Sequence, residues 1–314
     1  MPSLRNQAFV LLLQLIRRKR IYASAKHLNA SIREVRRKGA APPHKSMAKR
    51  LNVISQLYEG RLVHTIGPRH GEAKRQVLYL HGGAYVRPIT RFHWNLIENL
   101  ALTTGLTFTV PEYPLAPEST CEHTLGFVLR LYEELTRHHP LSHLTVMGDS
   151  AGGGLALATA LARRDRGQTL PHRLVLITPW VDVDSQHPQL ETAARRDPML
   201  AIDGARHAGR LYAGSLGTQH PWVSPLHADL HDLPPTTLLA GTRDLCHLDT
   251  LTLVHRARQH GSAIDLRLVP DMIHVWPLLP TPEGKQARRE LAELLNQPCS
   301  SGSTVTPVHS PTRR

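Results

Sequence analysis

A strand, a glycine-rich turn and a helix are expected in direct succession around Ser150, and this succession constrains the fold more than any other feature. The apolar stretch 144–147 leads into Gly148-Asp-Ser-Ala-Gly152, and an alanine- and leucine-rich stretch follows. A serine on so tight a turn needs neighbours without side chains, because a Cβ there would clash with the adjoining strand and helix. The pattern predicts an accessible serine hydroxyl at the end of a strand. It also places the Ala151 N–H at a helix N-terminus, where it can hold negative charge.

A second glycine motif, His81-Gly-Gly-Ala-Tyr85, follows the apolar stretch 76–80. The backbone N–H groups of Gly82 and Gly83 are donors of the kind that bind the oxyanion of a tetrahedral intermediate. Because Gly-x-Ser-x-Gly alone is weak evidence, the presence of both motifs in this order carries the interpretation. We expect His81 to brace this loop. For Asp149, bracing the same loop and facing outward from the turn are equal alternatives.

The serine needs a base, because its hydroxyl is a poor nucleophile at neutral pH. The chain has 21 histidines, so position must choose among them. In a fold that carries its serine on such a turn, the order along the chain is serine, acid, histidine. His274 follows the last strand candidate, 264–269, and Asp244 follows the preceding one, 237–240. The sequence therefore predicts Ser150, Asp244 and His274 as a triad.

Three other aspartates compete with Asp244 for the role of acid. Asp249 lies five residues further on and is expected on the following helix, as a supporting residue. Asp271 is too close to His274 in sequence to approach from a neighbouring strand, and Asp197 is expected in a cap over the site.

The chain resembles bacterial α/β-hydrolases of the hormone-sensitive-lipase-like esterase family over roughly residues 60–296. It departs from the family at Pro114, where many relatives carry arginine, and at Ala84, where many have a third glycine. The first departure puts a local ion pair in doubt, whereas the second leaves backbone donors intact. The resemblance rests on His81-Gly-Gly-Ala-Tyr85, Tyr113-Pro-Leu-Ala-Pro-Glu118, Gly148-Asp-Ser-Ala-Gly-Gly153, Thr178-Pro-Trp-Val-Asp182, Asp197-Pro198, Gly241-Thr-Arg-Asp244 and Met272-Ile-His274.

An α/β-hydrolase fold is therefore expected, with a mostly parallel central sheet, helices on both faces and a helical cap. Apolar strand candidates alternate with helical stretches from Gly60 onward, and parallel strands covered on both faces should be apolar throughout. The sequence predicts strands at 77–80, 106–110, 144–147, 174–177, 237–240 and 264–269, and helices near 93–103, 121–138, 151–165, 201–213, 247–260 and 283–295.

We divide the chain into three parts. Residues 1–58 are expected to form a basic, helical N-terminal cap segment, broken at 39–43. Residues 59–296 form the catalytic domain, with a cap insertion at about 181–220. The tail, 297–314, is rich in Ser, Thr and Pro and is expected to be disordered.

Positive charge is concentrated at the N-terminus. Residues 1–50 hold thirteen Lys or Arg against one acid, Glu34, and so carry +12 of the formal net charge of +13. The arm begins with the apolar run 8–16, followed by Arg17-Arg-Lys-Arg20. This run is too short to span a bilayer, and bases that follow it reverse the order of a secretory signal. We therefore expect a cytoplasmic protein.

Two roles are open for this arm. Its apolar side chains Leu11, Leu12, Leu15 and Ile16 can pack on the body, with the bases in solvent, in a cap that completes the acyl pocket. Alternatively, it is an interfacial helix that makes peripheral contact with anionic membrane. The family resemblance favours the cap. No nucleic-acid partner is expected, because the arm lacks interleaved aromatic residues and no nucleic-acid motif is present.

The resemblance implies a carboxylic ester hydrolase acting on small esters of short to medium acyl chains. An amidase or deacetylase of small acylated compounds remains an alternative that the sequence does not separate. The complete set of serine, acid and histidine argues against a non-catalytic ligand-binding protein on the same fold. Candidates for lining the substrate pocket are Tyr85, Trp180 and Trp276, with Trp222 beside them.

No cofactor and no metal are expected, since nucleotide-binding glycine fingerprints, Walker loops and helical His-x-x-x-His spacings are missing from the sequence. Three widely spaced cysteines, Cys121, Cys246 and Cys299, are expected as reduced thiols. The sequence leaves the oligomeric state open.

Overall fold

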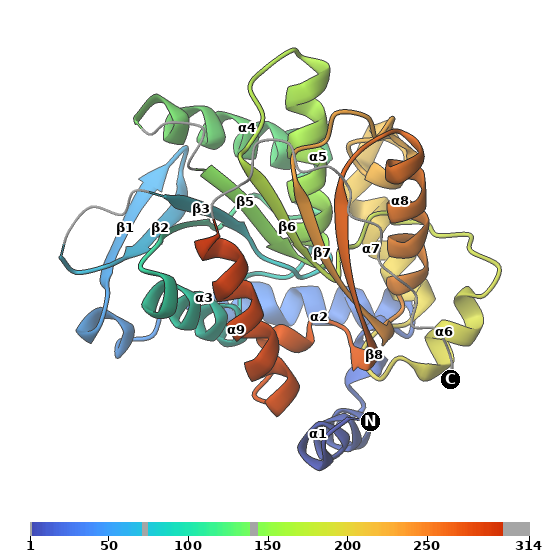
Figure 1. Ribbon diagram of the computed structural model, residues 1–314. Coiled ribbons are helices and arrows are strands. Elements are labelled where there is room, and N and C mark those ends of the chain that lie inside the picture. The colour runs from blue at the N-terminus through green and yellow to red at the C-terminus, as the bar shows by residue number, and fades with distance from the viewer. Residues whose placement is uncertain (1, 71–74, 139–143, 298–314) are drawn as a thin grey trace, which may run out of the picture.

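An eight-stranded sheet forms the centre of the computed structural model, which describes residues 2–70, 75–138 and 144–297 (Figure 1). The strands run in the order β1-β2-β4-β3-β5-β6-β7-β8, and every pair from β4 to β8 is parallel. The predicted mostly parallel sheet is thus confirmed. The strands are β1 (Asn52–Tyr58), β2 (Arg61–Gly67), β3 (Gln76–Leu80), β4 (Thr107–Pro111), β5 (Leu144–Asp149), β6 (Arg173–Ile177), β7 (Thr236–Arg243) and β8 (Ile264–Ile273).

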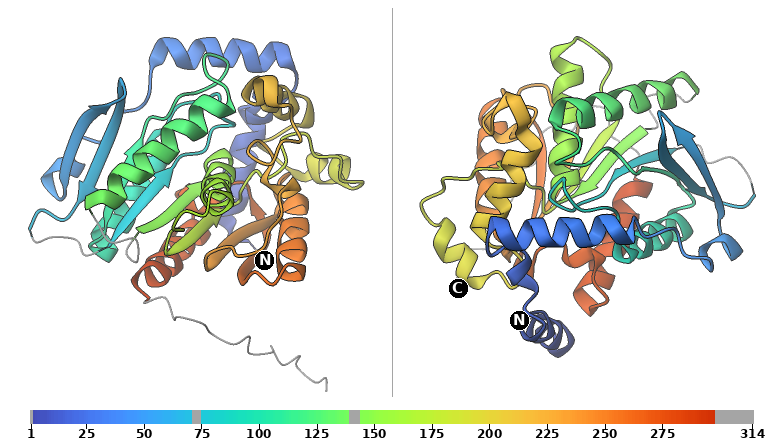
Figure 2. Two further views of the ribbon diagram at one scale, coloured as in Figure 1. Left: turned by 90° about the horizontal axis from the view of Figure 1, so that it is seen from above. Right: turned by 180° about the vertical axis from the view of Figure 1, so that it is seen from behind.

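Helices cover both faces of the sheet, as predicted (Figure 2). Successive side chains of a strand point to opposite faces: Leu78 and Leu80 of β3 pack with α4 and α5, whereas Val77 and Tyr79 pack with α3 and α9. The helices are α1 (Leu4–Leu15), α2 (Ala25–Lys38), α3 (Arg91–Thr104), α4 (Cys121–His138), α5 (Ala151–Asp165), α6 (Leu190–Arg196), α7 (Ile202–Ala213), α8 (His247–Gln259) and α9 (Pro282–Asn296).

The prediction that residues 1–58 are helical is wrong for its last part. Residues 52–58 form β1, which pairs antiparallel with β2 across the two-residue turn Glu59-Gly60. Both turn residues have positive φ, as a tight hairpin between twisted strands requires. Most side chains of β1 are exposed because it lies at the sheet edge, so the apolar run that marks a buried strand is missing.

The cap gathers two parts of the chain that are distant in sequence. The 3₁₀ segment η1 (Arg18–Tyr22) and helix α2 lie against α7, and the Tyr22 backbone leaves room only for a glycine at Gly204 (Figure 2). Helix α2 is also tied to the body, because Arg36 Nη2 pairs with Glu118 Oε2 at 3.0 Å. The expected insertion at about 181–220 thus includes α6 and α7, of which α6 was not predicted.

Two further expectations concern the C-terminal tail and the membrane. Apart from Gln297, the tail 297–314 lies outside the described residues. Among the helices that the structure describes, none combines the length and the apolar character needed to cross a membrane.

Candidate active site

Ser150 lies on a sharp turn between β5 and α5. Its backbone has φ 52° and ψ −121°, a conformation that a non-glycine residue rarely adopts and that is typical of functional sites. A side chain on Gly148 would clash with the Gly152 carbonyl, and one on Gly152 would clash with Leu80 at the end of β3. The glycines on either side of Ser150 therefore allow the turn that the sequence predicted.

The structure brings the predicted Ser150, His274 and Asp244 together. The Ser150 hydroxyl donates to Nε2 of His274 at 2.8 Å, and Nδ1–H of His274 donates to Oδ2 of Asp244 at 2.9 Å. Each residue directly follows the carboxyl end of a parallel strand, β5, β7 or β8. These strand ends meet at one edge of the sheet, which is where open α/β sheets bind their ligands.

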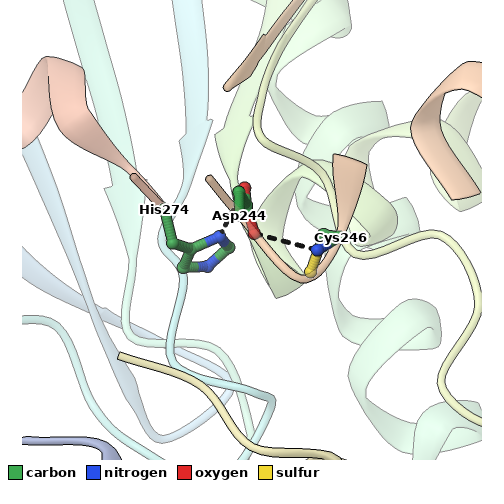
Figure 3. A group of neighbouring side chains, drawn as sticks. All are labelled: Asp244, Cys246 and His274. Carbon is green, nitrogen blue, oxygen red and sulfur yellow. Dashed lines mark hydrogen bonds and ion pairs between the residues drawn. The ribbon is translucent and has the colours of Figure 1, made fainter. Parts of the chain in front are cut away.

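Asp244 is held from both sides of its carboxylate (Figure 3). Its Oδ2 accepts from His274, and its Oδ1 accepts the Cys246 N–H at 2.9 Å. Asp244 and His274 are almost completely buried. The orientation of the imidazole is therefore fixed by a carboxylate that has little freedom of its own.

The side chains of Asp244, Cys246 and His274 also place three potential metal-ligand atoms within 4.8 Å of one another. Burial, followed by the charges of Asp244 and Asp249, raises the pKa of the Cys246 thiol well above its ordinary value. A protonated thiol is a poor metal ligand, because metals bind the thiolate. The His274 nitrogen and the Asp244 carboxylate already bind each other, so the donor set fits a hydrogen-bonded pair with a neutral thiol beside it.

Three nearby carboxylates shape the titration of His274. Burial opposes the charged imidazole, but Asp244, and beyond it Asp197 and Asp149, raise the pKa of His274 above its ordinary value of 6.5. Such a shift stabilises the imidazolium that forms when the histidine takes a proton.

None of the three rival aspartates contacts the His274 ring. Asp197 accepts the N–H groups of Met199, Leu200 and Leu245, and so ties the cap segment to the loop that carries Asp244. Burial, and then the charge of Asp244, raises the pKa of Asp197 to about 6.

The other two rivals have partners elsewhere. Asp271 pairs with Arg196 at the surface. Asp249 accepts from the Ser185 hydroxyl at 2.9 Å and lines the cavity described below. Burial raises the pKa of Asp249 to about 7.

Of the three predicted oxyanion donors, Gly82 differs from Gly83 and Ala151 in its hydrogen bonding. The Gly82 N–H donates to Asp149 Oδ1 at 3.0 Å, so the prediction for Gly82 does not hold in this geometry. The N–H groups of Gly83 and Ala151 have no acceptor among the described residues, and Gly83 and Ser150 line the same cavity. These two groups are therefore the donors available to a developing negative charge on a group bound to Ser150.

Asp149 points inward and braces the loop of Gly82, which decides between its two predicted positions. Tyr79 donates to the same Oδ1 at 2.5 Å, and His93 Nε2 lies 3.4 Å from Oδ2. Burial alone would raise the pKa of Asp149, but the facing His93 and the hydrogen bonds from Tyr79 and Gly82 outweigh it and lower the pKa. Neither Tyr79 nor His93 was predicted from the sequence, although Tyr79 lies on the strand that leads into the glycine motif.

His81 is positioned to brace its loop. It is poorly suited to carry a proton. Its Nδ1–H donates to the Gly82 carbonyl at 2.7 Å, and its ring stacks on Tyr113 with centroids 4.3 Å apart. Burial, followed by the charge of His93, lowers the pKa of His81 to about 4, so the ring is neutral at neutral pH.

A cavity of about 590 Å³ opens over Ser150 and His274. Its wall is largely apolar: Phe9 and Leu13 come from α1, and Trp180 from the loop after β6. A space of this size and character fits a small-molecule ligand rather than a polymer.

Three of the four predicted aromatic wall residues do not line this cavity. Trp180 lines the cavity, but Tyr85 and Trp276 do not. Tyr85 is buried and stacked on Tyr212 with centroids 3.6 Å apart, and Trp276 lies in the core between the sheet and α9. Trp222 also lies away from the cavity, against Arg166. Large aromatic side chains are buried in the core here because burying them contributes most to stability.

Comparison with known proteins places this geometry in a family. Residues 77–278 match a family model described as "alpha/beta hydrolase fold". The chain belongs to this family. The match includes both glycine motifs, Asp244 and His274 of this α/β-hydrolase.

Similar proteins place the α/β-hydrolase near hormone-sensitive-lipase-like esterases and so confirm the predicted resemblance. The chain is 35% identical over 228 residues to a triacylglycerol lipase of Mycobacterium tuberculosis, covering 72% of this chain and 47% of that protein. It is 33% identical over 218 residues to an acetyl-hydrolase of Streptomyces hygroscopicus, covering 68% of this chain and 72% of that one. It thus spans about half the length of the mycobacterial lipase.

A solved structure agrees. An esterase from the bacterial hormone-sensitive lipase family superposes with a TM-score of 0.72 and 29% sequence identity, covering 87% of this chain and 98% of that one.

Proposed function

We propose that this α/β-hydrolase cleaves carboxylic esters with Ser150 as the nucleophile. The observation that carries the proposal is the chain of two short hydrogen bonds from Ser150 through His274 to Asp244. Beside it lie the N–H groups of Gly83 and Ala151, which have no acceptor among the described residues. The relatives named triacylglycerol lipase, acetyl-hydrolase and esterase support the same reaction class.

In the first half-reaction, Ser150 Oγ attacks the ester carbonyl carbon while His274 Nε2 takes the hydroxyl proton. The carbonyl oxygen becomes an oxyanion that the N–H groups of Gly83 and Ala151 stabilise. The bond to the alcohol oxygen then breaks, and the His274 imidazolium donates its proton to that oxygen. An alcohol leaves and an acyl-serine remains.

In the second half-reaction, a water molecule takes the place of the alcohol. His274 accepts one proton of the water as its oxygen attacks the acyl-serine, and then returns this proton to Ser150 Oγ as the carboxylic acid is released. Throughout the cycle, Asp244 keeps the Nδ1–H tautomer of His274 in place and stabilises the imidazolium.

The proposed substrates are esters of short to medium acyl chains. The cavity of about 590 Å³ has an apolar wall to which α1 contributes, and it contains the Ser150 hydroxyl. The N-terminal segment contributes Phe9, Leu12 and Leu13 to this pocket. Leu11 and Leu15, which were also expected to pack on the body, are exposed instead.

A panel of p-nitrophenyl esters of increasing chain length, with the matched anilides, tests this function. We expect the highest kcat/KM for a short or medium acyl chain, a decline for long chains, and slower cleavage of the anilides. Cleavage of no ester above the rate of Ser150→Ala would contradict the proposal, and a preference for the anilides would make the protein an amidase.

The pH profile of kcat/KM should show an acid limb with a midpoint above 6.5, because His274 accepts a proton only when neutral and its pKa is raised. Activity is therefore expected to be lost as the pH falls through this raised value. In Asp244→Asn, the residual activity should show a midpoint shifted to lower pH, because the largest charge favouring the imidazolium is gone. Asp249→Asn is the matched control and should leave the midpoint unchanged. A wild-type midpoint at or below 6.5 would contradict the raised pKa of His274.

A further inference from the structure

Helix α1 is apolar on two opposite sides. Its inner side packs on the body through Val10 and Leu13, which are almost completely buried. Its outer side carries Leu4, Leu11 and Leu15, which are 82%, 55% and 71% exposed. Residues at these spacings share one side of a helix. A surface helix normally turns its polar side to solvent and buries its apolar side, so an apolar outer side left in solvent indicates a missing partner.

The position of α1 leaves this outer side accessible. The helix projects from the edge of the molecule, below α2 and β8 in the first view (Figures 1 and 2). Its start is fixed to α9, because both the backbone N–H and the hydroxyl of Ser3 donate to Glu283. The helix is thus held in place by its first turn and its inner side, while three leucines face outward.

The segment that carries these leucines bears charges of one sign only, although Glu283 of α9 lies beside its first turn. Residues 2–33 contain no acid and seven bases: Arg5, Arg17, Arg18, Lys19, Arg20, Lys26 and Arg33. Arg5, Arg17 and Arg20 are exposed, and they lie on α1 or directly after it. A second copy of this chain would bring like charges together at this surface, whereas anionic headgroups complement it.

The outer side is also continuous with the cavity. Leu12 and Ile16 are 49% and 61% exposed and at the same time line the cavity over Ser150. The exposed apolar surface therefore runs from the tip of α1 to the cavity wall.

We propose that the outer side of α1 docks on an anionic lipid surface, with Leu4, Leu11 and Leu15 inserted among the acyl chains and the bases at the headgroups. A helix of 12 residues fits this interfacial position and is too short to span the membrane. Docking would place the cavity at the membrane, where hydrophobic esters are concentrated. This last consequence rests on the proposed ester hydrolysis, but the docking itself does not.

Flotation with phosphatidylcholine vesicles, with and without phosphatidylglycerol, tests the proposal on the full chain. We expect binding to the vesicles that contain phosphatidylglycerol and its loss at high salt. The double variant Leu11→Gln/Leu15→Gln should bind at least about ten-fold more weakly, because two leucines no longer leave water. The double variant Arg17→Gln/Arg20→Gln should lose about five-fold per arginine.

Leu57→Gln is the matched control, since Leu57 is 73% exposed but lies on β1 at the edge of the sheet. It should bind vesicles like the wild type. The leucine variants spare the side chains that line the cavity, so their hydrolysis of water-soluble p-nitrophenyl butyrate should be unchanged. A protein inactive on all esters could still float with vesicles, so the two proposals fail separately.

Two results would overturn the docking. The first is equal flotation of the wild type and Leu11→Gln/Leu15→Gln. The second is a wild type that binds no vesicles, combined with a molar mass by light scattering that is lower for Leu11→Gln/Leu15→Gln than for the wild type. That result would make this face a contact between copies of the chain.

Discussion

The Ser150→Ala variant is expected to lose ester hydrolysis almost completely, with kcat about 10⁶-fold lower, as in other enzymes where serine and histidine act as a unit. Without Oγ no acyl-serine forms, and His274 has no nucleophile to activate. The fold should persist, because alanine takes the same space at the turn and the removed hydroxyl contributes a single hydrogen bond to His274. Steady-state kinetics on p-nitrophenyl butyrate, with circular dichroism to check folding, measure the effect.

Ser185→Ala is the control for this variant. Ser185 also lines the cavity, but its hydroxyl donates to Asp249 rather than to His274. Its replacement should change kcat far less than that of Ser150. Comparable losses in the two folded variants would contradict the special role of Ser150.

Asp244→Asn should lower kcat by about 10⁴-fold. An asparagine NH₂ group facing Nδ1 would stabilise the tautomer of His274 that carries its proton on Nε2, so this nitrogen could no longer accept the Ser150 proton. The hydrogen bond from the Cys246 N–H can be kept by the amide oxygen, which limits any loss of structure. The measurement is again kcat on a soluble ester.

Asp249→Asn distinguishes the acid of the triad from its neighbour. Both aspartates are buried and stand five residues apart, but the Asp249 carboxylate binds Ser185. Its replacement should cost much less activity. If Asp249→Asn proved the more damaging change, Asp249 would have to replace Asp244 as the acid.

The arrangement of Ser150, Asp244 and His274 could be predicted because it depends on local rules. The glycines around Ser150 leave few other turns open, and continuous apolar runs mark the buried strands whose ends carry Asp244 and His274. Since the carboxyl ends of parallel strands meet at one edge, knowing the strand order along the chain was enough to bring these residues together.

Features that depend on side-chain packing could not be predicted in this way. The motif around Gly82 predicts an oxyanion donor because it presents N–H groups, but the sequence does not reveal that Asp149 turns inward and accepts the Gly82 N–H. Its turn inward depends on Tyr79 and His93, which come from β3 and α3. Such a network forms only in the folded core, and no residue spacing in the sequence indicates it.

The wrong placement of the aromatic residues and the absence of β1 and β2 from the predicted strands have related causes. Tyr85 and Trp276 lie next to site residues in sequence, yet burial in the core outweighs that proximity. Strand β1 escaped notice because an edge strand with exposed side chains lacks an apolar run. Its pairing with β2 is set by the turn at Glu59-Gly60. This dipeptide predicts a tight hairpin only when both flanking stretches are known to be strands.

Labelling with a fluorophosphonate tests the central claim most directly, because this reagent forms a stable adduct only with a serine that a neighbouring base activates. Intact-protein mass spectrometry should show one adduct per chain, and peptide mapping should place it on Ser150. Prior incubation with a slowly hydrolysed ester should slow the labelling, and His274→Ala should abolish it. An adduct on another serine, or equal labelling of Ser150→Ala, would contradict the account.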